Sequence, residues 1–147
     1  NFGTSTVASA TTRRQLYAIK FGSVSGTFTA DEEINQASTG AVGKVVEFDS
    51  TNLILYYYQT RFPDVGTDSN GNLTAFSGAN AITGQSSSAS ATPDTSNSNT
   101  VNGVEFSSGY ANPELAFDSG DIIYVEERSP ITRASDQTEN VKLIIEF

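Results

Sequence analysis

Residues 44–60 read KVVEFDSTNLILYYYQT, and the pattern of this stretch decides the fold class. An apolar run at 44–48 is followed by four polar residues at 49–52 and then by a second apolar run at 53–60. Two short runs joined by a four-residue polar connection are typical of a β-hairpin. We therefore expect an antiparallel pair of strands here.

The second strand of this hairpin is apolar or aromatic on both of its faces. Successive side chains of a strand point to opposite faces of the sheet, so residues at odd positions lie on one face and residues at even positions on the other. Because neither set is polar, we expect both faces to be covered. The three tyrosines fit core packing with their hydroxyls at the rim, and they also fit a binding surface. The two sets are Leu53, Leu55 and Tyr57 on one face, and Ile54, Tyr56 and Tyr58 on the other.

Alternation with a period of two recurs along the chain, whereas no helical apolar stripe runs beyond a turn or two. Segment 84–100, GQSSSASATPDTSNSNT, has no aliphatic residue larger than Ala and predicts a flexible Ser/Thr/Asn-rich loop. The whole pattern predicts a single all-β domain over residues 1–147, mainly antiparallel, built as a sandwich or barrel with long polar loops. We expect further strands at 15–21, 24–30, 73–76, 101–106, 121–127 and 139–147, and one helical turn at 113–117.

A short pattern, F-x5-I-x3-S-[ST]-[GS]-A, occurs twice in the chain. The copies begin at Phe28 and Phe76, and their offset is constant, since 76 minus 28 and 82 minus 34 both give 48. A duplicated strand-loop-strand unit explains the pattern, with the Phe and Ile residues as buried anchors and the small residues as the turn. Chance similarity in a Ser- and Ala-rich chain is the alternative explanation.

The composition excludes several classes of chemistry. The 147 residues include no Cys and no His, which excludes disulfides, thiolate metal sites and imidazole-dependent triads. A net charge of -9 repels phosphate backbones and anionic membranes, and so predicts neither a nucleic-acid nor a membrane partner. No apolar run approaches the roughly 20 residues of a transmembrane helix, and the start of the chain lacks the apolar stretch of a signal peptide. We expect a soluble protein without cofactors.

Two groups of oxygen-bearing side chains suggest possible sites. Residues 64–72, DVGTDSNGN, offer the ligands that calcium prefers, but the EF-hand spacing fails because Asn72 is followed by Leu73 rather than Gly. We favour an ordinary turn here, and the sequence leaves metal binding open. Carboxylate pairs could act on a glycoside, and the candidates are Glu32 with Glu33, Glu126 with Glu127, and Asp118 with Asp121. Adjacent residues of a strand point to opposite faces, so neither Glu-Glu doublet presents two carboxylates to one substrate. For the acidic doublets we favour a solvated surface.

The last part of the chain carries its most specific motif. Residues 120–131 read GDIIYVEERSPI, and after a short gap residues 136–139 read DQTE and lead into an apolar run that continues to Phe147. Pro130 fixes the backbone between the two apolar runs and has no N–H group to donate to a neighbouring strand. This polar hinge is either a surface hairpin connection or a docking segment whose charges pair with another subunit. We expect the final run to be tied into a sheet or an interface.

This motif resembles the C-terminal end of the baseplate wedge protein, the gene-eight product, of T-even-like contractile-tailed phages. The middle of the chain, with YYYQTRFPDVGTDSNGNLTAFSGANAITG and SSGYANPE, looks like the cyanophage branch of that family. Ser129 departs from the family pattern, where a second Pro can stand at this position. Since family members are longer on the N-terminal side, we expect this chain to correspond to the C-terminal part of a longer wedge protein. Residues 1–35 carry no resemblance.

The resemblance implies a structural, non-catalytic subunit of the virion tail baseplate, assembled in the host cytoplasm. It implies a homodimer that contacts other baseplate wedge proteins and contributes to the machinery that triggers sheath contraction. The residues that we expect at an assembly interface are Tyr124, Glu126, Arg128, Pro130, Arg133, Asp136, Gln137, Thr138 and Glu139.

Two other classes of protein fit parts of the pattern. A carbohydrate- or receptor-binding β module of a virion fibre or a cell-surface adhesin is the main alternative, and it requires an exposed Tyr cluster in a shallow groove. A glycoside hydrolase fragment requires two carboxylates that converge in a cleft.

Overall fold

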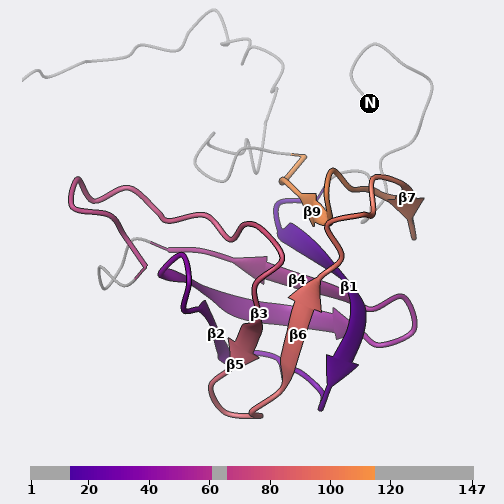
Figure 1. Cartoon of the computed structure of the whole chain (residues 1–147), viewed down its shortest axis with the longest axis horizontal. Helices are drawn as coiled ribbons and strands as arrows, with labels where there is room; N and C mark the ends of the chain where they lie inside the picture. Colours follow the sequence, from indigo (N-terminus) through magenta and orange to yellow (C-terminus); the bar gives the residue numbers. More distant parts are fainter. Residues whose placement is uncertain (1–13, 61–65, 115–147) are drawn as a thin grey trace, which may run out of the picture.

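The computed structural model describes residues 14–60 and 66–114. These residues form nine strands and no helix (Figure 1). The all-β class predicted from the sequence is therefore confirmed. The strands are β1 (Tyr17–Ser25), β2 (Glu33–Gln36), β3 (Ala41–Asp49), β4 (Ile54–Tyr58), β5 (Ile82–Gly84), β6 (Ser90–Pro93), β7 (Thr100–Val101), β8 (Val104–Glu105) and β9 (Tyr110–Ala111).

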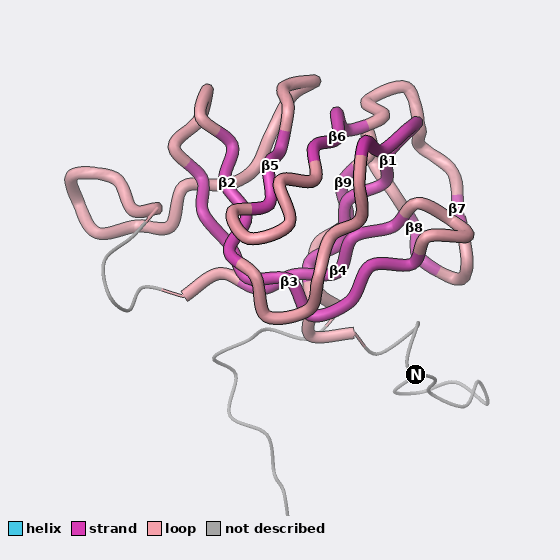
Figure 2. Tube along the Cα trace, turned by 90° about the horizontal axis from the view of Figure 1, so that it is seen from below, coloured by secondary structure: helices cyan, strands magenta, loops and turns pink. Residues whose placement is uncertain are grey.

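Six of these strands close into a barrel (Figure 2). Neighbouring strands follow the order β4-β3-β2-β5-β6-β1, and β1 pairs again with β4, so the sheet returns on itself. All of these pairings are antiparallel. Strands β2, β3 and β4 form a meander, and β1 lies beside β4, which is the arrangement of a Greek key. Of the two predicted architectures, the barrel is the one that forms.

Strand β1 closes the barrel because its two halves have different partners. Residues 17–20 pair with β4, with Tyr17 opposite Tyr57. Residues 21–25 pair with β6, and this second pairing contains a register shift between Phe21 and Val24. One strand therefore replaces the two predicted at 15–21 and 24–30, and the prediction was wrong for residues 26–30, which are not in a strand. Gly26 ends it with a φ of 82°, and a Cβ at this glycine would stand 3.2 Å from the Cα of Ala89.

The predicted hairpin at 44–60 is confirmed as β3 and β4, although β3 begins three residues earlier, at Ala41. The Asp49 carboxylate shapes the connection, since its Oδ1 accepts the backbone N–H groups of Thr51 and Asn52, each at 2.9 Å. Leu53 then adopts a left-handed conformation with a φ of 52° and leads into β4. A register shift between Val45 and Glu47 leaves Val46 40% exposed on the outside.

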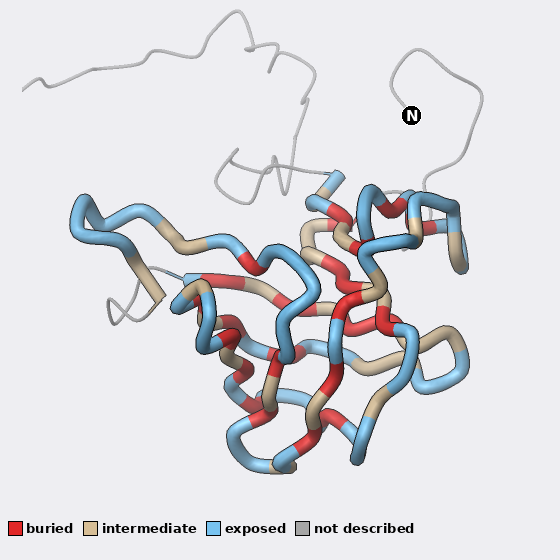
Figure 3. Tube along the Cα trace, in the orientation of Figure 1, coloured by how far each residue is buried: buried red, intermediate tan, exposed pale blue. Residues whose placement is uncertain are grey.

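The barrel interior contains the main hydrophobic core. Ile19, Val45 and Leu55 are fully buried in it. Aromatic rings fill one end, where Tyr57 stacks on Tyr17 with 5.3 Å between ring centroids and meets Phe76 edge-on at 4.9 Å. Buried residues follow the strands, while the connections between strands are largely exposed (Figure 3). Burial of these side chains stabilises the barrel by about 1.5–3 kcal/mol for each large apolar residue.

A second hydrophobic cluster lies on the other face of β1 and β4. Val104 and Phe106, from the β7–β8 hairpin region, pack there with Ala18 and Ile54. Tyr56 lies against the same cluster. The expectation that both faces of this strand are covered is confirmed, because Ile54 and Leu55 point opposite ways and both have no exposed surface.

The sequence repeat corresponds to two hairpins of the barrel. The first copy forms β2 and β3, and the second forms β5 and β6. The expectation that the Phe and Ile anchors of both copies are buried is confirmed. The turns match in detail, because Ala41 donates its N–H to Thr39 Oγ1 at 3.2 Å and the equivalent Ala89 donates to Ser87 Oγ at 3.1 Å.

The two copies meet through equivalent positions. Strands β2 and β5 pair antiparallel with Asn35 opposite Thr83, and these residues occupy the same place in the two copies. Equivalent residues face each other across an antiparallel pair only where a local two-fold axis relates the strands. The barrel therefore has an internal pseudo-two-fold axis between β2 and β5.

The prediction of a flexible loop at 84–100 was wrong for part of its length. Residues 90–93 form β6, which pairs with both β1 and β5. Alternation is present here, but it is carried by small residues and a proline, since Ala89, Ala91 and Pro93 are buried. Because these buried residues are small or a proline, the sequence of β6 lacks the large aliphatic residues that indicate a strand.

Three other expectations from the sequence need correction. The predicted strand at 73–76 is reduced to one isolated bridge between Thr67 and Leu73. The predicted strand at 101–106 is a hairpin, because Asn102 and Gly103 both have positive φ, 49° and 76°, and turn the chain back. The predicted helical turn at 113–117 shows no helix in its described part, 113–114. The predicted strands at 121–127 and 139–147 lie outside the described residues.

The two Ile anchors of the repeat provide a test of its structural equivalence. We expect Ile34→Ala and Ile82→Ala each to lower the free energy of unfolding by about 2–5 kcal/mol, because both side chains are fully buried and leave a cavity. Val46→Ala is the control and should change it by no more than about 0.5 kcal/mol. Urea unfolding followed by circular dichroism measures all three. A marked difference between the two Ile variants would contradict the equivalence.

Candidate functional site

The residues that the sequence marks for assembly all lie outside the described residues. The same holds for the carboxylate pairs Asp118 with Asp121 and Glu126 with Glu127. The described residues do contain the other candidates, together with buried polar side chains that the sequence did not single out. The predicted assembly residues are Tyr124, Glu126, Arg128, Pro130, Arg133, Asp136, Gln137, Thr138 and Glu139.

Glu32 and Glu33 point apart, as predicted, but Glu32 is not solvated. Glu33 is exposed on β2, whereas Glu32 is only 4% exposed. The Glu32 carboxylate accepts hydrogen bonds from the N–H groups of Thr29 (2.7 Å), Ser86 (3.2 Å) and Ser87 (2.9 Å), and from the Ser87 hydroxyl (2.9 Å). The solvated-surface interpretation was therefore wrong for Glu32, which holds the β5–β6 turn against the start of β2.

The hydrogen bonds at Glu32 determine its charge state. Burial alone raises the pKa of this carboxyl, but the bonds from Ser87, Thr29 and Ser86 outweigh burial and bring the pKa below its usual value of 4.5. Gly84 provides the space for this arrangement, since a Cβ there would stand 2.6 Å from Glu32 Oε2. The group is thus an ionised structural carboxylate with no free lone pair directed at a substrate.

Gln36, in the same copy of the repeat as Glu32, has a matching role for the other loop. Its Oε1 accepts the Ser77 N–H at 2.9 Å and the Thr39 hydroxyl at 3.0 Å, and its Nε2 donates to the carbonyl of Asn80 at 3.0 Å. Ser77 is the repeat equivalent of Thr29, which Glu32 binds. The pseudo-two-fold relation therefore extends to the loop residues that are held, although Glu32 and Gln36 themselves are not repeat equivalents.

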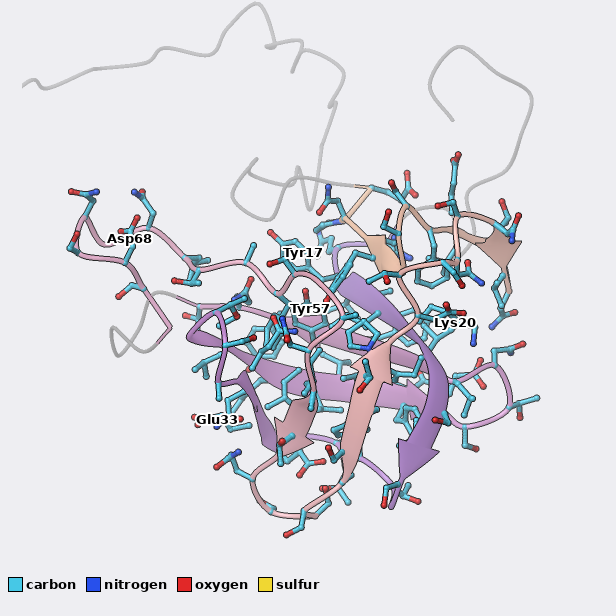
Figure 4. All side chains as sticks on the ribbon, viewed as in Figure 1. Tyr17, Lys20, Glu33, Tyr57 and Asp68 are labelled. Atoms are coloured by element: carbon cyan, nitrogen blue, oxygen red, sulfur yellow. The ribbon has the colours of Figure 1, made fainter. Side chains whose placement is uncertain are left out.

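The Asp68 loop has the geometry of a turn (Figure 4). Asp68 Oδ1 accepts the N–H groups of Asn70 at 2.8 Å and Asn72 at 2.9 Å, and Oδ2 accepts Asn72 Nδ2 at 3.3 Å. The hydrogen bond from the Asn72 backbone contributes most to lowering the pKa of Asp68. Both carboxylate oxygens are engaged within the loop, which supports the turn interpretation. No group of three or more acidic residues in the described ranges could hold a metal ion.

The three consecutive tyrosines do not form one exposed cluster. Tyr57 is 3% exposed and packs with Tyr17 in the barrel (Figure 4). Burial raises the pKa of the Tyr57 hydroxyl far above its usual value. Tyr56 lies against the outer hydrophobic cluster, and Tyr58 is half-buried. The prediction of core packing therefore holds for Tyr57. The described residues do not favour a carbohydrate-binding surface.

Arg14 lies where the described chain enters and leaves the barrel. Its guanidinium donates from Nε to the Leu16 carbonyl at 2.9 Å and from Nη2 to the Asn112 carbonyl at 2.8 Å, and its own carbonyl accepts the Glu114 N–H at 2.7 Å. The side chain is 5% exposed. Burial lowers the pKa of Arg14, and the charges of Glu114 and Tyr56 oppose that shift. No sequence pattern marked this residue, because its partners are backbone carbonyls, one of them far away in the sequence.

The described part of the chain has the properties of a structural body. Its buried polar side chains, Arg14, Glu32, Gln36 and Gln59, bond mainly to backbone groups of loops and turns. Glu32 and Glu33 do not converge on one cleft. In residues 14–60 and 66–114 no helix is long and apolar enough to cross a bilayer. The arrangement holds loops and chain ends in place.

The comparison with protein families identifies the class. A family model described as bacteriophage T4 Gp8 matches residues 59–147, which is more than half of the chain. A protein of this class is a structural component of a phage tail baseplate wedge. The chain belongs to the family of Gp8 of bacteriophage T4, the gene 8 baseplate wedge protein. No curated protein and no solved structure matches it.

The family membership bears on the earlier hypotheses. The resemblance of the C-terminal motif to the baseplate wedge protein is confirmed, and the matched range contains that motif. A virion tail location follows from the family, and the receptor-binding alternative is not favoured.

Glu32 provides a test of the buried polar arrangement. We expect Glu32→Gln to lower the free energy of unfolding by about 1–3 kcal/mol. The variant replaces a charged acceptor by a neutral amide, and the amide NH₂ group then faces the N–H and O–H donors that bind the carboxylate in the wild type. Since the folded-state pKa is lowered, the ionised carboxylate stabilises the fold above its usual pKa of 4.5, and this stabilisation is lost as the pH falls through the folded-state value. The difference between wild type and variant should therefore be largest near neutral pH and shrink below 4.5.

The exposed neighbour offers a matched control for this measurement. Glu33→Gln makes the same chemical change at a solvated position and should alter stability by no more than about 0.5 kcal/mol. Denaturant unfolding at a series of pH values measures both variants. Equal behaviour of the two would show that the bonds to Glu32 contribute nothing specific.

Proposed function

We propose that this chain mediates subunit assembly in the wedge of a contractile phage tail, with the barrel as a rigid body and the C-terminal segment as the docking element. The observation that supports this role is the range of the family match, 59–147, which includes every residue of the predicted interface. The proposed partners are a second copy of the chain and other baseplate wedge proteins, and the proposed role extends to the machinery that triggers sheath contraction.

The chemistry of the C-terminal motif fits a polar docking segment. Two basic residues, Arg128 and Arg133, are followed by two acidic residues, Asp136 and Glu139. Charges of both signs in one segment favour a defined register against a complementary surface, because like charges in a wrong register repel. Tyr124 adds a large ring of the kind enriched at interface cores. The proposal includes assembly in the host cytoplasm before the tail is complete.

A non-catalytic role agrees with the composition and with the buried polar groups. His and Cys are absent from the whole sequence. Among the described residues, the buried carboxylate of Glu32 is fully engaged in holding a turn. The chain is proposed to act through its shape and contacts, and cofactors have no part in this role.

Deletion of residues 136–147 tests the docking role. We expect the shortened chain to lose self-association and incorporation into wedge complexes, while circular dichroism still reports a folded β-barrel. Sedimentation velocity measures the oligomer, and co-purification with co-expressed wedge proteins measures incorporation. An unchanged oligomer with normal incorporation would refute the docking role.

A charge reversal tests the same role without removing residues. We expect Arg133→Glu to weaken association by about tenfold or more, because it places a like charge where an acidic partner group is proposed. Lys44→Glu, at an exposed position of β3, is the matched control and should leave association within about twofold. Equal effects of the two variants would indicate a general charge effect and count against a specific contact at Arg133.

A further inference from the structure

The two ends of the described chain are joined at Arg14. Its guanidinium donates from Nε to the Leu16 carbonyl at 2.9 Å and from Nη2 to the Asn112 carbonyl at 2.8 Å. Its own carbonyl accepts the Glu114 N–H at 2.7 Å. We call these three hydrogen bonds the clasp. Leu16 precedes β1 and Asn112 follows β9, so the clasp connects the entry of the barrel to its exit.

The clasp lies outside the closed ring of six strands. The pairing of β1 with β4 closes this ring, and β9 is added to β1 beyond it, with Ala18 opposite Ala111. The strand pairings within the ring involve neither Arg14, Asn112 nor Glu114. Opening of the clasp therefore leaves every strand pairing of the ring in place.

Hydrogen bonds rather than core packing hold the exit of the chain. Ala111 is buried, but Asn112 and Glu114 are exposed and Pro113 is half-buried. Segments with few buried apolar contacts open at a lower free energy than the core does. Residues 112–114 belong to this class, and two of the three clasp bonds are made to them.

Burial of the Arg14 side chain makes the closed clasp less stable than its contacts suggest. Removal of a cation from water costs free energy that its new partners must offset. Burial lowers the pKa of Arg14, because it outweighs the electrostatic effects of Glu114 and Tyr56, which raise that pKa. Nη1 is withdrawn from solvent and has no hydrogen-bond partner within residues 14–60 and 66–114. Opening of the clasp returns this nitrogen to water, which offsets part of the loss of the other bonds.

We propose that the clasp opens locally while the barrel stays closed, and that the Arg14 side chain sets how often it opens. In the closed form the planar guanidinium holds the Asn112 carbonyl, and this keeps the Glu114 N–H beside the Arg14 carbonyl. In the open form both bonds are broken and residues 112–114 separate from the entry of the barrel. The direction in which the chain leaves the barrel is then no longer fixed.

The local opening stands apart from the assembly role. It concerns residues 14–16 and 112–114 alone, and it is measured on the isolated chain. One consequence rests on the proposed function, since an open clasp lets the proposed docking element change direction while the barrel remains a rigid body. Deletion of residues 136–147 leaves the residues of the clasp unchanged, so the two proposals fail separately.

Hydrogen exchange of backbone amides in the full-length chain tests the proposal. The Glu114 amide reports the clasp, and the amides of Val45 and Gly84 report the barrel, because each of these two bonds to a carbonyl within it. We expect Glu114 to exchange about tenfold or more slowly than in an unstructured peptide, at a rate that low urea concentrations leave unchanged. The two barrel amides should exchange at least about 100-fold more slowly than Glu114, and urea should accelerate them.

Arg14→Gln and Lys20→Gln form a matched pair of variants. Each removes a cation that bonds to the backbone, but Lys20 Nζ donates to the neighbouring Phe21 carbonyl at 2.6 Å and takes no part in the clasp. We expect Arg14→Gln to accelerate Glu114 exchange by about tenfold or more. The barrel amides should be accelerated by no more than that factor, because the variant loses only what the closed clasp contributes. Lys20→Gln should leave Glu114 exchange within about twofold.

A second measurement uses the wild type and remains informative if Arg14→Gln fails to fold. Nitrogen-15 NMR of the arginine side chains reports the exchange of the Arg14 Nη protons with water. We expect this exchange to be as insensitive to urea as that of the Glu114 amide, because one opening exposes both groups.

Three outcomes would overturn the proposal. The first is Glu114 exchange with the urea dependence of the barrel amides, since the clasp would then open only with the whole barrel. The second is a wild-type Glu114 amide without protection, and the third is equal Glu114 exchange in Arg14→Gln and the wild type.

Discussion

The pairing of β1 with β4 is the constraint on which the rest of the structure depends. It brings Tyr17 opposite Tyr57 and turns a six-stranded sheet into a closed barrel. The same two strands carry both hydrophobic clusters, one on each face, so their alignment sets the interior core and the packing of the β7–β8 hairpin together. A shift of one residue would move Leu55 out of the interior and Ile54 into it. Because Ile54 and Leu55 are both apolar, the pattern of residues 53–58 does not set this register by itself, and the Asp49 connection between β3 and β4 constrains it as well.

The folded body extends beyond the range of the family match. The match begins at Gln59, directly after β4, and includes β5, β6 and β9. Each of these strands pairs with β1 or β2, which precede the matched range. Residues before Gln59 thus complete a barrel whose other strands belong to the family-matched part. The Arg14 contacts to Asn112 and Glu114 extend this dependence to the exit of the chain.

The sequence predicts those elements whose signal is local. The β3–β4 hairpin and the buried anchors of the repeat are visible because large apolar residues alternate or recur at a fixed offset. Strand β6 was missed because its buried positions are Ala91 and Pro93, which give little hydrophobic signal. Glu32 and Arg14 were missed for a different reason, since their partners lie 55 and 98 positions away and only the closed barrel brings them together. The family was recognised from the C-terminal motif, and the structure describes none of that motif.

The closed ring also affects how these molecules behave at high local concentration. An open sheet presents unpaired N–H and C=O groups along its outer strands, and these groups can template pairing with a second molecule. Here β1 and β4, which would be the two outer strands of an open sheet, satisfy each other. Strand addition at this seam is therefore blocked when many copies are crowded into one particle. Contacts between such bodies then depend on side chains, which discriminate between partners far better than backbone ladders do.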